Sequence, residues 1–466
     1  MSEAALTTGK IEQASVDKLQ VEFAGRVLRP GDEDFDDARL VYNGMFSGRK
    51  PAAILQCTST EDVVTAVNFV RENGLLFAVK SGAHSIAGFS AIDGGVVIDL
   101  SRMTNVDVDP DTKIASAQAG VKWAAFDAAT QEHGLATPGG FVSTTGVAGL
   151  TLNGGIGLLS PKYGLTCDHL VGAEVVTASG DVLWVSEDDN QDLLWGLRGG
   201  GGNFGIVTRF DLRLFPVTDV YWRVAMYSAE RGAEVLRSYR EGVAGSPDDL
   251  LSAAIFSTVP VHPMMPEELH GRKVWNVFAG YIGPESEGEA VTAFIPVLSD
   301  PLANFGMQIP YVMAQQFQDE EAVWGHQNYW KSGLLDELSD EVIDRIAELA
   351  PTVSSPLCTV TLLTLGGAIA DVDEDATAYS HRDAKFNFSI DNIWENPDEN
   401  EAQIAWARDF FAQIHPFMRG VYLNFIGDEG LDRVREAYGG KYERLVQLKR
   451  KYDPSNLFRL NQNIKP

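Results

Sequence analysis

Four short segments hold the residue types and spacings best suited to chemistry. In residues 79–88 an apolar run ends in a loop of small residues that contains one histidine, His84. Successive free backbone N–H groups in such a loop can form a nest for anionic oxygens. Taken alone, a loop of this kind is more often an ordinary connection with a surface histidine. It also lacks the Gly-x-Gly-x-x-Gly spacing of dinucleotide-binding folds, and no long helix follows it.

The second and third segments are dense in glycine. Residues 138–157 combine glycines, which allow close backbone approach, with hydroxyl groups that can bond to phosphate or ribose. Residues 198–205 read Arg-Gly-Gly-Gly-Gly-Asn-Phe-Gly and run directly into an apolar segment. A purely structural loop is the alternative for both. Because so long a glycine-rich stretch inside a compact domain usually packs its backbone against something, we expect both segments to hold a ligand.

The fourth segment is a predicted strand over residues 421–426. Tyr422 and Asn424 share one of its faces, so both side chains could point into a site. The alternative is a half-exposed strand with Tyr422 packed in the core. A second strand places Asn387, Ser389 and Asp391 on one face, although simple amphipathic alternation explains this pattern equally well.

The elements around these segments alternate between β and α. A helix over residues 61–73 follows the N-cap candidates Ser59 and Thr60 and ends at Gly74. Pro216 marks a boundary, after which strands alternate with amphipathic helices. The other predicted elements are strands over residues 52–57, 75–80, 96–100, 113–117 and 206–214, a hairpin over 171–177 and 182–185, and helices over 123–133, 230–242, 339–349 and 440–452.

The composition excludes several classes of protein. The 466 residues carry 65 Asp and Glu against 37 Lys and Arg, a formal charge of −28. Nucleic-acid binders and proteins that dock on anionic membranes need a basic face, so both classes are excluded. A hydrophobic fraction of 45% is too high for a disordered acidic chain and indicates a folded protein of two or more domains.

The acidic excess has two interpretations. One is a solvated surface that favours solubility, and the other is adaptation to high salt, which we favour. The charge avoids the second segment, because Lys162 is the only charged residue between Pro138 and Leu165. The −28 therefore describes the solvent-facing shell rather than a site.

Processing signals and metal sites are absent from the sequence. Cys57, Cys167 and Cys358 are too few and too widely spaced for a disulfide framework, and neither they nor the histidines have metal-ligand spacing. Residues 1–20 lack an apolar signal core, and no apolar run approaches the roughly 20 residues of a membrane helix. We expect a cytoplasmic protein without a bound metal.

Together, these segments resemble the FAD-linked oxidases of the berberine-bridge-enzyme-like group, in the vanillyl-alcohol oxidase and p-cresol methylhydroxylase superfamily. Lys80-Ser-Gly-Ala-His84 is similar to that family's Arg-x-Gly-Gly-His motif. The resemblance covers about residues 40–466, and its other parts are residues 138–175, which include Lys162-Tyr-Gly-Leu-Thr-Cys-Asp-His169, then 379–382, 422–425 and 452–458, with Asn461 and Asn463.

The resemblance implies an α+β fold. A two-subdomain FAD-binding domain of the p-cresol methylhydroxylase type would span residues 1–217, with its core at about 47–217. Residues 420–466 would complete this domain and the active site. Residues 218–419 would form an α+β substrate domain whose antiparallel sheet covers the flavin.

The resemblance also implies FAD bound covalently through its 8α-methyl group to His84. Lys80 and Ala83 depart mildly from the family motif, and Val142 replaces the cysteine that makes a second flavin bond in some members, so no cysteinyl link is expected. Thr145 aligns near the position that gates oxygen access. The other implied cofactor-binding residues are Ser81, Gly82, Ser85, Gly88, Thr144, Gly146, Gly149, Asn153, Gly154, Gly155, Gly157, Gly205, Ile206, Val207, Asn424 and Asn463.

The implied reaction is hydride transfer from an alcohol carbon of a sugar, an oligosaccharide or a secondary-metabolite alcohol to the flavin. Tyr422 is the predicted base, with a pKa lowered by neighbours. Asn387 and Ser389 are predicted helpers, and Asp391 is the alternative base. Oxygen or another acceptor would reoxidise the flavin, in a monomer or homodimer. The alternatives are a catalytically silent flavoprotein and a nicotinamide-dependent dehydrogenase, which the missing fingerprint argues against.

Overall fold

Three sheets organise the computed structural model, which describes residues 6–9, 11, 13–263 and 265–466. The first sheet has the order β1-β2-β4-β3, in which β2, β4 and β3 are parallel. Helix α3, Thr60–Glu72, connects β2 to β3, and the Ser59 side chain caps it by accepting the N–H of Asp62. The strands are β1 (Arg26–Leu28), β2 (Ala53–Gln56), β3 (Phe77–Lys80) and β4 (Val96–Asp99), and helices α1 (Gln13–Glu22) and α2 (Phe35–Ala38) flank them.

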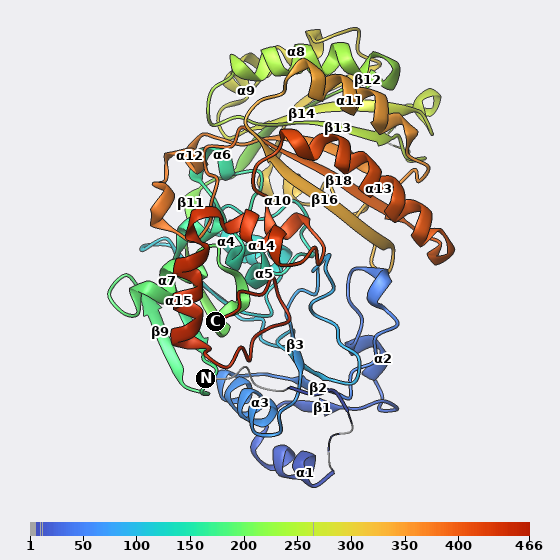
Figure 1. Ribbon diagram of the computed structural model, residues 1–466. Helices are drawn as coiled ribbons and strands as arrows, with labels where there is room; N and C mark the ends of the chain where they lie inside the picture. The colour runs from blue at the N-terminus through green and yellow to red at the C-terminus, as the bar shows by residue number, and fades with distance from the viewer. Residues whose placement is uncertain (1–5, 10, 12, 264) are drawn as a thin grey trace.

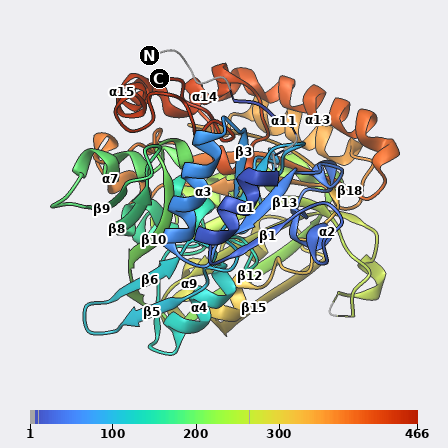
Figure 2. The same ribbon diagram turned by 90° about the horizontal axis from the view of Figure 1, so that it is seen from below.

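The second sheet is antiparallel and has the order β5-β6-β10-β8-β9. Its strands are β5 (Val106–Asp109), β6 (Ile114–Gln118), β8 (Leu170–Val176), β9 (Val182–Ser186) and β10 (Ile206–Arg213). Helices α4 (Trp123–Gln131), α5 (Val147–Leu152), α6 (Ser160–Tyr163) and α7 (Gln191–Leu197) and the short pair β7 (Leu135–Ala136) and β11 (Phe215–Pro216) complete this part. Figure 2 shows it beside α1 and α3 of the first part.

The third sheet has seven antiparallel strands in the order β15-β12-β14-β13-β17-β18-β16. Its strands are β12 (Asp219–Ser228), β13 (Leu251–Thr258), β14 (Lys273–Tyr281), β15 (Ala303–Pro310), β16 (Gln327–Leu335), β17 (Thr359–Thr364) and β18 (Phe386–Trp394). Helices α8 (Gly232–Ala244), α11 (Asp340–Leu349) and α13 (Asn400–Ile414) cover its outer face (Figure 1). The remaining helices of this part are α9 (Glu285–Val291), α10 (Tyr311–Gln315) and α12 (Ala368–Asp371).

The inner face of the seven-stranded sheet packs on the glycine-rich part of the chain. Ala253 and Phe278 of this face share an apolar cluster with Ile156 and Leu158. On the outer face, Phe256 and Phe388 pack with the apolar stripe of α11, where Ile343 is buried. The sheet is therefore covered on both faces, and one of them meets the segment in which we predicted a ligand site.

The chain returns at its end to the first two sheets. Helices α14 (Leu431–Tyr438) and α15 (Tyr442–Tyr452) lie here, and Leu445 of α15 and Ile464 of the tail that follows join the same core as Phe77 and Phe210. Figure 1 shows α15 beside α7. The predicted α+β class is confirmed, whereas the boundaries at residues 217 and 419 stay predictions. Among the residues that the structure describes, no helix is both long and apolar enough to span a bilayer.

One local prediction is wrong. Residues 421–426 form no strand, because the chain makes a short 3-10 turn at Leu423–Phe425 (η11). The alternation there arises because neighbouring side chains enter different cores: Val421 and Leu423 join the core of the first two sheets, and Tyr422 joins the inner-face cluster. The glycine-rich segment 138–157 contains the six-residue helix α5, which no signal in the sequence predicted.

Candidate active site

A large cavity lies between the inner face of the seven-stranded sheet and the two N-terminal sheets. Its volume of about 1090 Å³ is at the upper end of typical ligand sites. It brings together residues from all of the predicted segments. These are Ser81, Gly82, Ala83, His84, Ser85, Val142, Thr145, Gly146, Gly149, Asn153, Gly205, Ile206, Val207, Ser389, Asp391, Tyr422 and Asn424.

His84 lies in the cavity wall and packs against two aromatic rings. Its ring stacks on Tyr42 with centroids 4.5 Å apart, and Trp324 meets it edge-on at 5.5 Å. The Thr144 hydroxyl lies 3.0 Å from His84 Nε2. Burial, helped by the nearby positive charge of Lys122, lowers the pKa of His84 to about 3. The imidazole is therefore neutral at physiological pH, and Thr144 leaves Nδ1 as its available nitrogen.

The loop around His84 is tightly held. Ala83 adopts φ +57°, a left-handed conformation that favours the glycine of the family motif. A Cβ on Gly82 would lie 2.3 Å from the backbone nitrogen of Gly146, so the loop can touch the second segment only through glycine. Lys80 points elsewhere, because its ammonium pairs with Asp99 at 3.8 Å. It does not line the cavity, contrary to the role expected for it.

Tyr422 is buried, and its phenol oxygen is a focus of hydrogen bonds. It accepts the N–H groups of Gly155 and Ile156, each at 3.1 Å, and the Nδ2 of Asn424 at 2.9 Å. Gly155 has φ +88°, and a Cβ there would lie 2.1 Å from the Thr166 hydroxyl, so only glycine fits. Burial outweighs the three donors and raises the pKa of Tyr422 to about 12. The prediction of a lowered pKa is therefore wrong.

Asp391 lies on β18 and faces the same cavity. Thr359 donates to its Oδ2 at 3.5 Å, and its buried Oδ1 has no hydrogen-bond partner among the described residues. Burial raises the pKa of Asp391 to about 7. Ser389 also lines the cavity, but Asn387 does not, since it is fully buried and accepts the Ser332 hydroxyl at 2.8 Å.

The remaining predicted site residues stand outside the wall of the cavity. Thr144 and Gly155 act from behind it, through His84 and Tyr422 respectively. Gly88 packs against Phe46, because a Cβ at this position would lie 2.3 Å from that ring. The others that do not line the cavity are Gly154, Gly157 and Asn463.

Comparisons with known proteins agree with this geometry. Residues 51–186 match the model of an FAD-binding domain, and residues 421–465 match that of berberine and berberine-like proteins. An FAD-linked oxidoreductase of Dictyostelium discoideum is 33% identical over 446 residues, which are 95% of this chain and 95% of that protein. The chain belongs to the berberine-bridge-enzyme-like family of FAD-linked oxidoreductases.

Two other relatives of this FAD-linked oxidoreductase have named activities. The xylooligosaccharide oxidase of Thermothelomyces thermophilus is 28% identical, and the match covers 89% of this chain and 87% of that protein. The crystal structure of 6-hydroxy-D-nicotine oxidase from Arthrobacter nicotinovorans superposes with a TM-score of 0.85 at 26% identity, over 95% of this chain and 98% of that one. The fold is thus that of the p-cresol methylhydroxylase-type FAD oxidases.

The cavity of this FAD-linked oxidoreductase fits an extended dinucleotide. Gly149 and Gly202 line it with no atom within 4 Å of where a Cβ would stand, so the backbone is open to a ligand. Asn461 also lines it and offers a buried Oδ1 with no partner among the described residues. All three cysteines are buried and free, and none lines the cavity.

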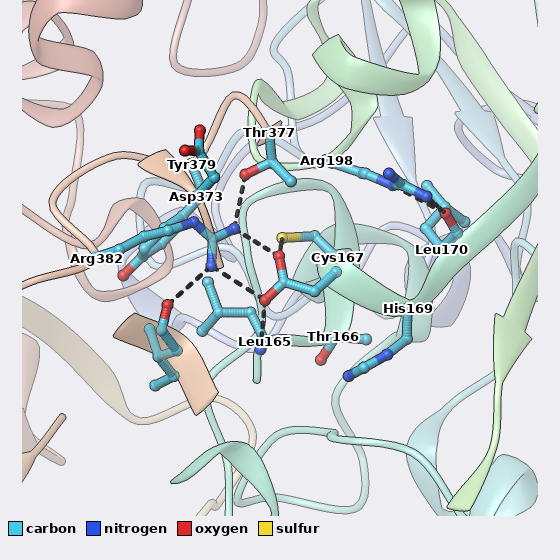
Figure 3. A network of polar contacts seen from close by, with 12 residues as sticks. Leu165, Thr166, Cys167, His169, Leu170, Arg198, Asp373, Thr377, Tyr379 and Arg382 are labelled. Carbon is cyan, nitrogen blue, oxygen red and sulfur yellow. Dashed lines mark hydrogen bonds and ion pairs between the residues drawn. The ribbon is translucent and has the colours of Figure 1, made fainter. Parts of the chain in front are cut away.

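A buried ion pair joins the two halves of the cavity wall from behind (Figure 3). The Arg382 guanidinium contacts both Asp168 oxygens, at 2.5 and 3.1 Å, and also binds the Thr377 hydroxyl at 2.7 Å. Arg382 stacks 5.5 Å from the centre of the Tyr379 ring, which meets Tyr422 edge-on at 6.3 Å. His381 and Arg382 therefore support the site without lining it.

Sequence reasoning missed the parts of the wall that come from distant segments. Tyr42 lies outside the four segments singled out in the sequence, and no local signal marked its stacking on His84. Residues 316–323 line the cavity from the seven-stranded part, and Asp319 there accepts the backbone N–H of Ser143 at 2.8 Å. Trp324 also lies outside those segments, and nothing in its spacing linked it to His84.

Proposed function

We propose that this protein takes a hydride from the alcohol carbon of a small molecule or carbohydrate onto an FAD bonded to His84, and that oxygen reoxidises the flavin. The observation that carries the proposal is the convergence of a neutral His84, packed against aromatic rings, and a hydrogen-bonded Tyr422 on one cavity that fits a dinucleotide. The xylooligosaccharide oxidase among the relatives supports an alcohol-bearing substrate.

His84 is proposed to hold the cofactor through Nδ1. A neutral imidazole has the lone pair that a covalent bond needs, and the depressed pKa of His84 keeps it neutral. Thr144, Tyr42 and Trp324 fix the ring in one orientation. Val142, in the position of the family's second attachment, offers no thiol, so the proposal includes a single covalent bond.

Tyr422 is proposed to accept the hydroxyl proton of the substrate. When bound, the flavin supplies the hydride acceptor, and the protein must supply the base. The three N–H donors on the phenol oxygen favour its anionic form, because a neutral phenol has only two lone pairs to share among them. Asp391 is the second candidate for this role, since its pKa lies near neutrality.

Acid precipitation of the purified protein tests the covalent bond. We expect the yellow colour to stay with the polypeptide, and His84→Ala to release it to the supernatant. His133→Ala is the matched control, because His133 is exposed at the end of α4. Colour that leaves the wild-type polypeptide would refute the His84 bond, and a colourless protein made with adequate flavin would refute the proposed function.

Anaerobic bleaching tests the activity. We expect an alcohol from a screen of sugars and aromatic alcohols to reduce the flavin, and oxygen to restore its colour with release of hydrogen peroxide. A flavoprotein that no alcohol bleaches would instead be a silent flavin-binding module. Bleached flavin that reoxidises only with another acceptor would refute the role of oxygen alone.

A further inference from the structure

We propose that the substrate is an alcohol that carries a positive charge, and that Asp391 binds that charge. This inference rests on the proposed function and names the substrate class for the same cavity. Two observations support it: the sign of the charges in the wall and the surroundings of Asp391.

Acidic side chains predominate in the cavity wall. Asp319, Glu320, Glu321 and Asp391 all line it. Among the described residues that line it, Arg459 is the one Lys or Arg, and it follows Phe458, whose ring packs on Phe77 of the first sheet. The seven-stranded sheet therefore presents no cationic side chain to the cavity. An anionic alcohol would meet only repulsion there, whereas a cation would be attracted.

Asp391 is placed to receive a cation. Its Oδ1 is buried and has no hydrogen-bond partner among the described residues. A buried carboxylate oxygen without a partner is costly, and a ligand cation would relieve that cost. In the sheet register, Asp391 lies opposite Trp330 of β16 and Thr359 of β17, so all three side chains share one face. Trp330 also lines the cavity and offers an aromatic face to a cation.

Polar and apolar side chains both lie around Asp391. Ser257, Thr359, Thr361 and Ser389 line the sheet side of the cavity. Trp330 and Ile393 line it as well, and Phe425 meets Trp330 edge-on at 6.0 Å. This wall accepts apolar and hydroxyl-bearing ligands alike, so the charge of the ligand is the property that Asp391 would select.

The two polar contacts proposed for the substrate come from different elements of the wall. Asp391 lies opposite Trp330 in the sheet. The Trp330 ring meets Phe425 at 6.0 Å, and Phe425 meets Tyr422 at 4.8 Å, so two aromatic rings link the two groups. A para-substituted ring, which carries its cation and its hydroxyl at different ends, is therefore a suitable probe for both contacts.

Three probes that share a benzyl alcohol and carry para substituents of different charge test the inference. They are 4-(aminomethyl)benzyl alcohol, 4-methylbenzyl alcohol and 4-(hydroxymethyl)benzoate, which are cationic, neutral and anionic at neutral pH. Their dissociation constants would be measured anaerobically on the holoprotein by quenching of tryptophan emission, since Trp330 lines the cavity. We expect the cation to bind at least about tenfold more tightly than the neutral analogue, with the anion weakest.

Asp391→Asn should reduce the preference for the cation to about twofold or less, because the amide keeps the shape and loses the charge. Glu320→Gln is the matched control: it removes a charge of the same sign from an exposed residue of the wall, where Glu320 pairs with His262 at 3.4 Å. We expect this variant to keep the preference. Loss of preference in Glu320→Gln, or its persistence in Asp391→Asn, would overturn the assignment to Asp391.

The wild-type comparison remains decisive even if Asp391→Asn does not fold. Equal or tighter binding of the neutral or anionic probe by the wild type overturns the inference. Its failure is distinct from failure of the proposed function: reduction of the flavin by alcohols without preference for the cation refutes only the inference. Preferential binding of the cation to a flavoprotein that no alcohol bleaches refutes only the proposed reaction.

Discussion

The pH dependence of flavin reduction separates the two candidate bases, Tyr422 and Asp391. Burial raises the pKa of Tyr422 to about 12 and that of Asp391 to about 7. The ionised fraction of a group of pKa about 12 rises about a hundredfold between pH 7 and pH 9. For a group of pKa about 7, the same change of pH raises the ionised fraction only about twofold.

Anaerobic stopped-flow measurement of flavin reduction by a neutral alcohol, at saturation and from about pH 6 to about pH 10, provides the assay. If Tyr422 is the base, the rate should rise about tenfold per pH unit without a plateau in this range. Tyr379 and Cys167 lie near the Tyr422 phenol, but burial raises the pKa of both well above neutrality, so both keep their protons. Neither residue should therefore add a plateau to the pH profile of the reduction rate.

Two variants complete the experiment. Tyr422→Phe should abolish the slope, and Asp391→Asn should keep it. Because Tyr422→Phe also leaves the buried N–H groups of Gly155 and Ile156 unsatisfied, it should cost about 1–3 kcal/mol of stability for each. Tyr379→Phe is the matched control for a buried tyrosine. A wild-type rate that levels off just above pH 7 would refute Tyr422 as the base, as would an unchanged slope in Tyr422→Phe.

Three further predictions concern stability. Ala83→Gly should raise the free energy of unfolding by about 1 kcal/mol, because φ +57° strains alanine; an unchanged or lower melting temperature would contradict this. Arg382→Ala should cost about 3–5 kcal/mol by stranding buried Asp168, whereas Arg419→Ala, at the more exposed pair with Asp336, should cost less than about 1 kcal/mol. Burial raises the pKa of Asp127 to about 7 from 3.8, so the folded state binds the proton more tightly and stability falls as pH rises between these values. Asp127→Asn should remove up to about 4 kcal/mol of that fall in denaturation curves, and an unchanged fall would refute it.

Local signals predicted the elements well. The helix found at Thr60–Glu72 had both a period of apolar residues and a capping serine, Ser59, which are set by neighbours in the chain. The alternation of β18 was likewise local, and it placed Ser389 and Asp391 on the cavity side. The family resemblance then supplied what spacing could not, namely that His84 and Tyr422 would line one cavity.

Contacts made at a distance were beyond the sequence. Tyr42 reaches His84 from a loop in which its backbone N–H bonds to the Ala83 carbonyl, and no pattern in the adjacent sequence marks that contact. Lys80 was expected at the cofactor because it replaces the arginine of a motif, yet Asp99 on the adjacent strand β4 holds it. The sequence also did not show how deeply Tyr422 is buried. The hydrogen-bond donors around its phenol lower its pKa, but burial raises the pKa by more.

Burial shifts the pKa of each of three polar groups in the cavity wall. It lowers the pKa of His84 to about 3 and raises that of Tyr422 to about 12, so both are neutral at pH 7. Asp391, with a pKa of about 7, is the group on the seven-stranded sheet that changes charge near neutrality. A bound cation would keep Asp391 deprotonated and would balance its negative charge. Reaction at Tyr422 would then depend on pH through Tyr422 alone, so a cationic alcohol should show the same tenfold slope per pH unit as a neutral one.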